Sequence, residues 1–153
     1  MNPETLEIKV ALQILKPVHE VFEAIVDPHK MKNYFISEST GRMEKGKTVV
    51  WKFPEFDIKF PVQVVQIEEY NLISYTWEGP DKKDLLVEIK LDSIKNNSTL
   101  VSISEKSMRN DETGINWLKN NTEGWANFLA CLKAYVEYGI NLRKGGFDFL
   151  MKK

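Results

Sequence analysis

Residues 124–139, GWANFLACLKAYVEYG, decide the fold because their apolar side chains recur at steps of three and four residues. This spacing predicts a long amphipathic helix, since residues three or four apart lie on one helix face. A stripe that carries both tryptophan and phenylalanine needs a concave apolar surface to pack against. The stripe contains Leu118, Trp125, Phe128, Leu129, Leu132, Val136 and Gly139.

The rest of the chain supplies that surface through short segments in which apolar and polar residues alternate. Strict alternation is typical of half-buried β-strands, and turn-forming residues between the segments favour an antiparallel sheet. Pro61 lies inside one predicted strand, so we expect that strand to lie at a sheet edge or to carry a bulge. The predicted strands cover residues 6–14, 42–44, 49–53, 56–64, 73–77, 87–91 and 99–105.

Two short helices are predicted directly after the first strand. Pro17 suits the first position of a helix, where its missing N–H costs nothing. Asp27 and Pro28 end this helix, and Pro28 begins a second one. The predicted fold class is therefore α+β: a curved antiparallel sheet of six to seven strands around a long C-terminal helix, called the helix-grip fold. We expect one domain over residues 1–153, with residues 143–153 either docked or frayed.

Composition limits the classes of function. The 21 basic and 22 acidic residues are interspersed, which argues against nucleic-acid binding because that function needs clustered Lys and Arg. The N-terminal residues lack the pattern of a signal peptide, and no apolar run approaches the roughly 20 residues of a membrane span. We therefore expect a cytoplasmic protein without membrane insertion. Cys131 is the single cysteine and is expected to be a buried, inert thiol.

Five stretches resemble the START-like superfamily, also called SRPBCC, and within it the AHSA type, named for homologues of a heat-shock chaperone ATPase activator. The resemblance implies a helix-grip fold with a pocket between sheet and helix. Family members usually carry a Trp-Phe pair where this chain has Tyr34 and Phe35. The matching stretches are ILKPVHEVFEAIVDP (14–28), MKNYF (31–35), GRMEKGK (41–47), VVQIEEYNLISYTWEG (64–79) and GWANFLACLKAYVEYG (124–139).

The sequence contains few groups that are typical of catalysis. His19 and His29 are expected to be solvated helix residues, and no metal-binding spacing, nucleophile elbow or phosphate-binding glycine loop is present. We therefore predict no metal, no cofactor and no catalytic residue, and favour a protein that is not an enzyme.

Glu105 is the one candidate for a polar functional group, because the alternation of its strand places it on the face that points toward the core. It shares the face of Val101 and Ile103 and would point toward the helix, where a carboxylate can anchor a ligand or exchange a proton. The alternative is that the strand ends near Ile103 and leaves Glu105 at a solvated rim.

The remaining candidates are mainly aromatic residues that either fill the core or line a pocket. Tyr and Trp have polar tips that need partners, and several around one cavity would suit a flat ligand. The candidate pocket residues are Tyr34, Phe35, Trp51, Phe60, Tyr75, Trp77, Ile89, Ile103, Glu105, Trp117, Trp125, Phe128 and Leu129.

Three classes of function follow. The favoured one is binding of a small hydrophobic or aromatic molecule in an apolar cavity between the sheet and the C-terminal helix. The second is a polyketide cyclase- or aromatase-like enzyme, as found elsewhere in the superfamily. The third is a co-chaperone-like protein-interaction domain. The N-terminal chaperone-binding domain of the eukaryotic activator has no counterpart in this sequence, so chaperone interaction is unsupported, and a homodimer is left open.

Overall fold

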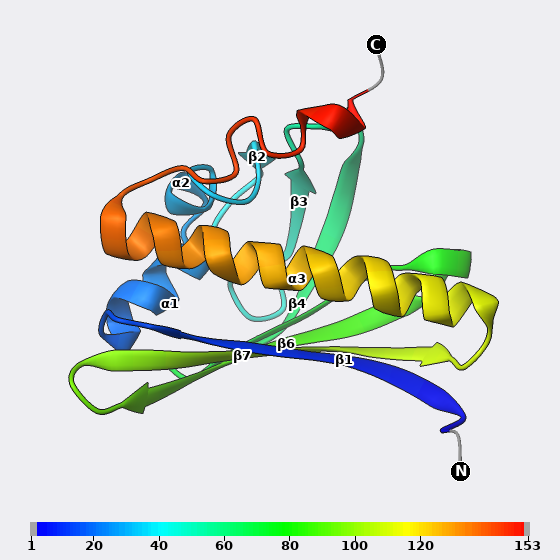
Figure 1. Ribbon diagram of the computed structural model, residues 1–153, viewed down its shortest axis with the longest axis horizontal. Helices are drawn as coiled ribbons and strands as arrows, with labels where there is room; N and C mark the ends of the chain where they lie inside the picture. The colour runs from blue at the N-terminus through cyan, green and yellow to red at the C-terminus, as the bar shows by residue number, and fades with distance from the viewer. Residues whose placement is uncertain (1–2, 152–153) are drawn as a thin grey trace.

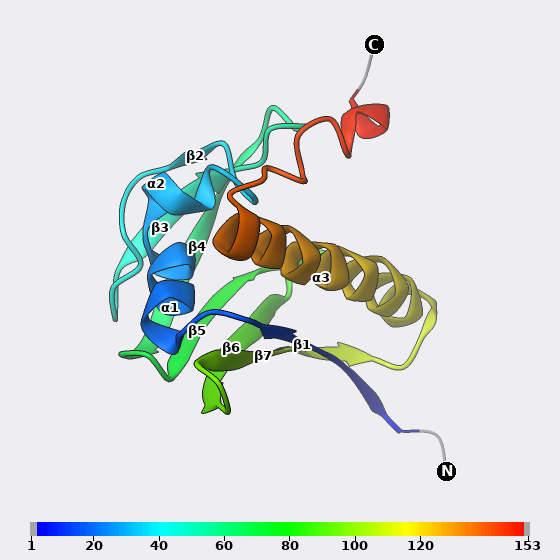
Figure 2. The same cartoon turned by 60° about the vertical axis from the view of Figure 1, so that its left-hand side comes forward.

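The computed structural model describes residues 3–151 and shows one curved sheet with a long helix across its concave face (Figure 1). A view turned by 60° shows how the sheet bends around helix α3 (Figure 2). The helices are α1 (Val18–Val26), α2 (Pro28–Met31) and α3 (Glu112–Tyr138), with 3₁₀ turns at Pro80–Lys82 and Asp148–Leu150. The strands are β1 (Thr5–Ile14), β2 (Glu38–Ser39), β3 (Thr48–Lys52), β4 (Lys59–Glu68), β5 (Leu72–Glu78), β6 (Asp84–Ile94) and β7 (Ser98–Arg109).

The seven strands form one antiparallel sheet in the order β1-β7-β6-β5-β4-β3-β2. This arrangement confirms the predicted α+β helix-grip fold. Every neighbouring pair except β1–β7 is consecutive in sequence, because turns and short loops connect strands β2 to β7 in a meander. The connection from β1 to β2 runs from one edge of the sheet to the other and contains α1 and α2, which lie together at one end of the sheet (Figure 1).

Helix α3 begins and ends at clear capping residues. Asp111 accepts a hydrogen bond from the Gly114 N–H at 2.9 Å, which pairs one of the free donors of the first turn. A Cβ at Gly114 would lie 1.8 Å from the Arg109 carbonyl oxygen, so only glycine fits there. Gly139 ends the helix in the left-handed conformation with φ of 68°. Gly139 is therefore an exposed cap, whereas we expected it to lie on the buried stripe.

Two predicted strand boundaries are wrong. Residues 42–44 form no strand; the short strand β2 comes earlier and pairs with the end of β3. The strand expected from residue 56 begins at Lys59, because Lys52 pairs with Lys59 and the residues between them form the connecting loop. Phe56 and Ile58, which were expected in that strand, are consequently exposed in the loop.

Pro61 is tolerated in β4 although this strand lies inside the sheet. It pairs with Val50 of β3, whereas the pairing of β4 with β5 starts only at Gln63. The missing N–H of Pro61 therefore costs no hydrogen bond on the β5 side. The bulge of β4 lies between Val64 and Gln66, away from the proline.

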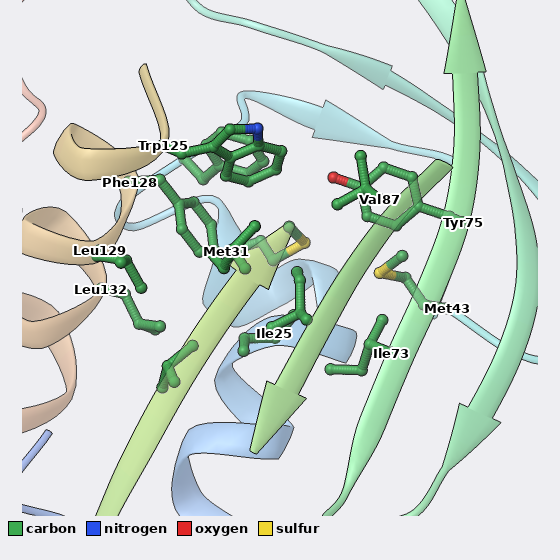
Figure 3. Packing of buried hydrophobic residues seen from close by; sticks show 14 of the residues in the cluster. Ile25, Met31, Met43, Ile73, Tyr75, Val87, Trp125, Phe128, Leu129 and Leu132 are labelled. Carbon is green, nitrogen blue, oxygen red and sulfur yellow. The ribbon is translucent and has the colours of Figure 1, made fainter. Parts of the chain in front are cut away.

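The core fills the space between the sheet, α1 and α3, as Figure 3 shows. The predicted strand parity is confirmed: Trp51, Tyr75 and Ile103 are buried beneath α3. Phe60 and Trp77 share this face and are partly exposed at its open end. The buried stripe of α3 contains Trp125, Phe128, Leu129 and Leu132, and Leu118 and Val136 pack against it.

The segment after α3 contacts the β3–β4 loop through Arg143, and residues 152–153 of the predicted tail lie outside the described residues. Arg143 forms an ion pair with Glu55 in the β3–β4 loop, and both side chains are largely buried. The guanidinium also lies over the rings of Phe53 and Phe147, at 5.3 and 4.6 Å from their centroids. Arg143 therefore fastens the segment over the open end of the sheet. Within residues 3–151, no helix has the length and apolarity to cross a membrane.

Candidate functional site

Two adjoining hollows open at the end of the sheet where Phe60 and Trp77 are partly exposed. The first, here the Glu105 hollow, has a volume of about 340 Å³. The second, here the tail hollow, has a volume of about 390 Å³ and borders the docked C-terminal segment. The Glu105 hollow is lined by Phe53, Phe56, Ile58, Phe60, Trp77, Glu78, Gly79, Glu105 and Asn121. The tail hollow is lined by Phe35, Phe53, Phe56, Trp77, Asn120, Asn121, Gly124, Trp125, Arg143, Phe147 and Leu150.

Together the two hollows form one feature, here the aromatic groove, because they share the side chains of Phe53, Phe56, Trp77 and Asn121. Its walls come from β4, β5 and β7, from the β3–β4 loop, from α3 and from the segment that follows α3. The rings lie close to one another: the centroids of Trp77 and Trp125 are 5.7 Å apart and those of Phe60 and Trp77 are 6.0 Å apart. Such a surface suits flat, apolar molecules.

Glu105 lies at the floor of the groove and has no exposed surface. Its Oε2 accepts a hydrogen bond from Trp77 Nε1 at 2.8 Å. Its Oε1 accepts two, from Trp125 Nε1 at 2.9 Å and from Asn121 Nδ2 at 3.1 Å. The carboxylate thus connects β7 to β5 and α3 and fixes the orientation of both indole rings.

This network contains only neutral donors. Indole nitrogen can donate and cannot accept, so Glu105 is the acceptor in both tryptophan contacts. Among residues 3–151, no Lys, Arg or His nitrogen lies within 4.0 Å of the Glu105 oxygens. Burial of an ionised carboxylate is costly unless it is paired, and here three hydrogen bonds supply the pairing without an opposite charge.

Asn121 covers Glu105 on the side of the groove. It is partly exposed, it lines both hollows, and its hydrogen bond to Glu105 is the longest of the three. Glu105 itself has no exposed surface, so the network borders the open space of the groove through Asn121 and Trp77, which line both hollows.

The buried core contains polar atoms without partners. Trp51 Nε1, Tyr75 Oη and Trp117 Nε1 are buried and make no hydrogen bond. Burial raises the pKa of Tyr75 well above its ordinary value, and the charge of Glu105 adds to this effect. In Figure 3 the Tyr75 hydroxyl points away from its strand, toward the side chains of α3. Tyr75 is consequently a neutral phenol without a partner.

The candidate residues from the sequence divide into two groups. Five of them, Phe35, Phe60, Trp77, Glu105 and Trp125, line the aromatic groove, where ligand contact stays a prediction. The others belong to the buried core, and the Tyr34 hydroxyl donates to the Ala24 carbonyl oxygen at 2.7 Å. These core residues are Tyr34, Trp51, Tyr75, Ile89, Ile103, Trp117, Phe128 and Leu129.

The solvated-rim alternative for Glu105 is wrong because β7 continues to Arg109 and keeps Glu105 inside the strand. Sequence reasoning also missed most of the groove lining, including Asn121, Phe53 and Arg143. Asn121 lies four residues before Trp125 on the same helix face, and this spacing was the signal that could have found it. Phe53 and Arg143 belong to irregular segments, where periodicity gives no signal. Cys131 is buried as expected, and burial raises the pKa of its thiol.

Other hollows of the described chain have more charged linings. One of about 370 Å³ beside the C-terminal segment contains the predicted pocket residues Tyr34 and Phe35 together with Lys32, Glu55, Arg143, Lys144 and Asp148. A hollow of about 570 Å³ on the convex face of the sheet is lined by charged side chains of both signs from β1, β6 and β7. Such alternating charges are typical of a solvated sheet face. Within residues 3–151, no three His, Cys, Asp or Glu side chains lie close enough to hold a metal ion. His19 and His29 are exposed on α1 and α2.

The fold and groove define a helix-grip protein, and comparisons with known proteins agree. Residues 16–137 match the family model described as Activator of Hsp90 ATPase homolog 1-like protein. Protein SSP2350 from Staphylococcus saprophyticus is 32% identical, with 90% of this chain and 96% of that chain covered and a TM-score of 0.78. The chain belongs to the family of Activator of Hsp90 ATPase homolog 1-like proteins, which confirms the AHSA-type resemblance.

Two more distant structures share the fold. DynU16, a protein in the dynemicin biosynthetic locus, is 22% identical over 88% of this chain and 48% of its own, with a TM-score of 0.76. The Aha1 dimer from Colwellia psychrerythraea is 17% identical, with 88% of this chain and 98% of that chain covered and a TM-score of 0.76. Identities this low show the fold alone. No curated protein matches the sequence.

Proposed function

We propose that the aromatic groove binds a small hydrophobic or aromatic molecule. The observation that carries the proposal is the position of Glu105, a fully buried carboxylate at the floor of an otherwise aromatic groove. Binding sites for small molecules are typically concave and apolar, of about 300–1,000 Å³, with a few polar groups that fix orientation. Both hollows have volumes in this range.

Stability alone does not account for Glu105. Burying a carboxylate costs desolvation free energy that its hydrogen bonds only partly offset, so the three hydrogen bonds of Glu105 are weak evidence for a purely structural role. Its hydrogen bonds hold the rings of Trp77 and Trp125 in fixed positions on the groove wall. A polar group that organises apolar walls around an open hollow is what selective binding requires.

Gly124 offers a direct test because it faces the tail hollow with open space around it. No heavy atom outside its own helix lies within 4 Å of the position that a Cβ would take. Gly124→Leu would therefore place a side chain in the hollow without a clash, and it also removes a glycine from a helix interior. Ala126→Leu adds the same atoms to an exposed position of α3 and is the matched control.

The experiment measures binding of Nile red, a neutral dye whose emission rises in apolar surroundings. We expect saturable binding to the folded wild type and to Ala126→Leu, and at least about tenfold weaker binding to Gly124→Leu, because blocking the hollow removes apolar contact area. Equal binding by all three proteins, or binding that starts only near the unfolding transition, would show that the groove is not the site.

Protein interaction is the second candidate because exposed apolar side chains surround the groove. Phe56, Ile58, Phe149 and Leu150 are 43%, 68%, 78% and 45% exposed. Apolar surface of this kind also marks protein-binding sites. Light scattering in solution would show whether a second copy of the chain covers it and would test the homodimer that the sequence left open. The cyclase-like alternative stays a prediction, with Glu105 as the acid–base group of the groove.

A further inference from the structure

The charged groups of the Glu105 hollow all have the same sign. Its lining contains two carboxylates, Glu105 at the floor and the exposed Glu78 at the rim, and no basic side chain. Its remaining lining residues are mainly aromatic and aliphatic. An apolar hollow whose only charges are negative is complementary to a molecule that combines an apolar body with a positive charge.

We infer that the molecule bound in the Glu105 hollow carries a protonated amine on an aromatic or aliphatic body. This inference rests on the proposed function and names the class of ligand. The ammonium group lies against Glu105, and the apolar body lies between Phe60, Trp77 and the exposed side chains of the β3–β4 loop.

The hydrogen-bond count at Glu105 leaves room for the ammonium. Each carboxylate oxygen can accept about two hydrogen bonds. Oε1 already accepts two, whereas Oε2 accepts one, from Trp77. Because Glu105 has no exposed surface, an ammonium donor reaches it once the Asn121 amide moves aside, and it then finds the free position on Oε2 and the vacated one on Oε1. This pairing supplies the positive charge that the buried carboxylate lacks within the described chain.

The aromatic rings around the carboxylate favour the same class of ligand. Trp77 lies between Phe60 and Trp125, with ring centroids 6.0 and 5.7 Å from its own. A cation near the faces of such rings is stabilised by their negative quadrupoles, and tryptophan is the most effective of them. A neutral ligand would gain the apolar contacts but neither of these electrostatic contributions.

The nearest basic residue of the groove does not reverse this preference. Arg143 lines the tail hollow and is absent from the lining of the Glu105 hollow. Its guanidinium is neutralised by Glu55 and is held over Phe53 and Phe147. An anionic ligand would therefore meet an engaged arginine in one hollow and two carboxylates in the other.

The test compares three probes with the same ring and different charges: 2-(1-naphthyl)ethylammonium, 2-(1-naphthyl)ethanol and 1-naphthylacetate. Calorimetric titration of the wild type near neutral pH gives the three affinities. We expect the ammonium to bind about ten- to a hundredfold more tightly than the alcohol, since hydrogen bonds to a charged group are roughly twice as strong as neutral ones. The acetate should bind most weakly.

Variants locate the effect. Glu105→Gln should reduce the affinity for the ammonium by at least about tenfold and change that for the alcohol by less than about threefold. Glu7→Gln, on the exposed convex face, is the matched control and should change neither affinity. The comparison of probes on the wild type stands even if the Glu105 variant folds poorly.

The outcomes separate this inference from the proposed function. If the alcohol binds as tightly as the ammonium, or the acetate binds best, the inference about the amine is wrong while binding of apolar molecules stands. If the ammonium, the alcohol and Nile red all fail to bind the folded protein, the proposed function itself is wrong.

Discussion

The hydrogen bonds of Glu105 should contribute measurably to folding stability. In Glu105→Gln the single amide oxygen can keep the place of Oε1 and accept from Asn121 and Trp125, which leaves Trp77 Nε1 facing an NH₂ group. One of three hydrogen bonds is then lost, and the other two no longer involve a charge. Because Trp77 is partly exposed, water can pair its nitrogen, so we expect a loss of about 1–3 kcal/mol.

Glu105→Leu should cost more although it removes a buried charge. It deprives all three donors of their acceptor, and the Trp125 indole is 4% exposed and cannot turn to water. A stranded buried donor costs about 1–3 kcal/mol, and the loss of the other two hydrogen bonds brings the expected total to about 3–5 kcal/mol. The expected order of stability is wild type, then Glu105→Gln, then Glu105→Leu.

Urea denaturation followed by circular dichroism measures both losses, and nuclear magnetic resonance identifies the donors. The chain has four tryptophans, so a proton–nitrogen correlation spectrum should contain four indole signals. In Glu105→Gln the signals of Trp77 and Trp125 should move far more than those of Trp51 and Trp117, which make no hydrogen bond. A Glu105→Leu variant as stable as the wild type, or unmoved Trp77 and Trp125 signals, would refute the network.

Three further predictions concern stability. Leu132→Ala at a fully buried position should cost about 2–5 kcal/mol in urea melts, and a loss well below about 1 kcal/mol would mean loose packing there. Tyr75→Phe removes a buried hydroxyl without a partner and should raise the unfolding free energy by up to about 1 kcal/mol, whereas destabilisation would show that the hydroxyl is paired. Burial raises the pKa of Glu137, but the hydrogen bonds from the Leu15 N–H and the Lys133 ammonium lower it by more. The net pKa is therefore below the ordinary value. The contribution of the Glu137 carboxylate to folding stability is therefore complete above a pH of about 4.3 and disappears as the pH falls through the lowered pKa. Glu137→Gln should reduce the unfolding free energy near neutral pH and change it little in acid. A loss that does not depend on pH would contradict this.

The sequence allowed the fold to be predicted because periodicity reports which face of an element is buried. The three-and-four spacing of Trp125, Phe128 and Leu132 defines the buried face of α3, and strand parity puts Trp51 and Tyr75 beneath it. These patterns arise from burial itself, and a shift of one residue in a strand would turn every core side chain to the solvent. The alternation therefore predicts which side chains of a strand face the core as well as the presence of the strand.

The groove could be predicted only in part because its walls depend on contacts between distant segments. Phe53 and Arg143 come into contact because the C-terminal segment packs on the β3–β4 loop. The Arg143–Glu55 pair that holds these segments together is 88 residues apart along the chain. The alternation of apolar residues includes Phe56 and Ile58, which lie in the loop before β4, so the strand was predicted to start too early. Sequence alone does not distinguish an exposed apolar residue from a buried one. The contact of Lys133 with the Gln13 carbonyl oxygen is likewise invisible to spacing within the helix.

A nuclear magnetic resonance titration of the wild type with 2-(1-naphthyl)ethylammonium tests most directly whether the aromatic groove binds small molecules. We expect saturable shifts, with one molecule per chain, at the indole N–H signals of Trp77 and Trp125 and at the Gly124 amide, which line the groove. The indole of Trp117, buried under the other part of α3, should not move. An absence of shifts with this probe and with 2-(1-naphthyl)ethanol and Nile red, or saturable shifts confined to residues outside the groove, would contradict binding in the groove.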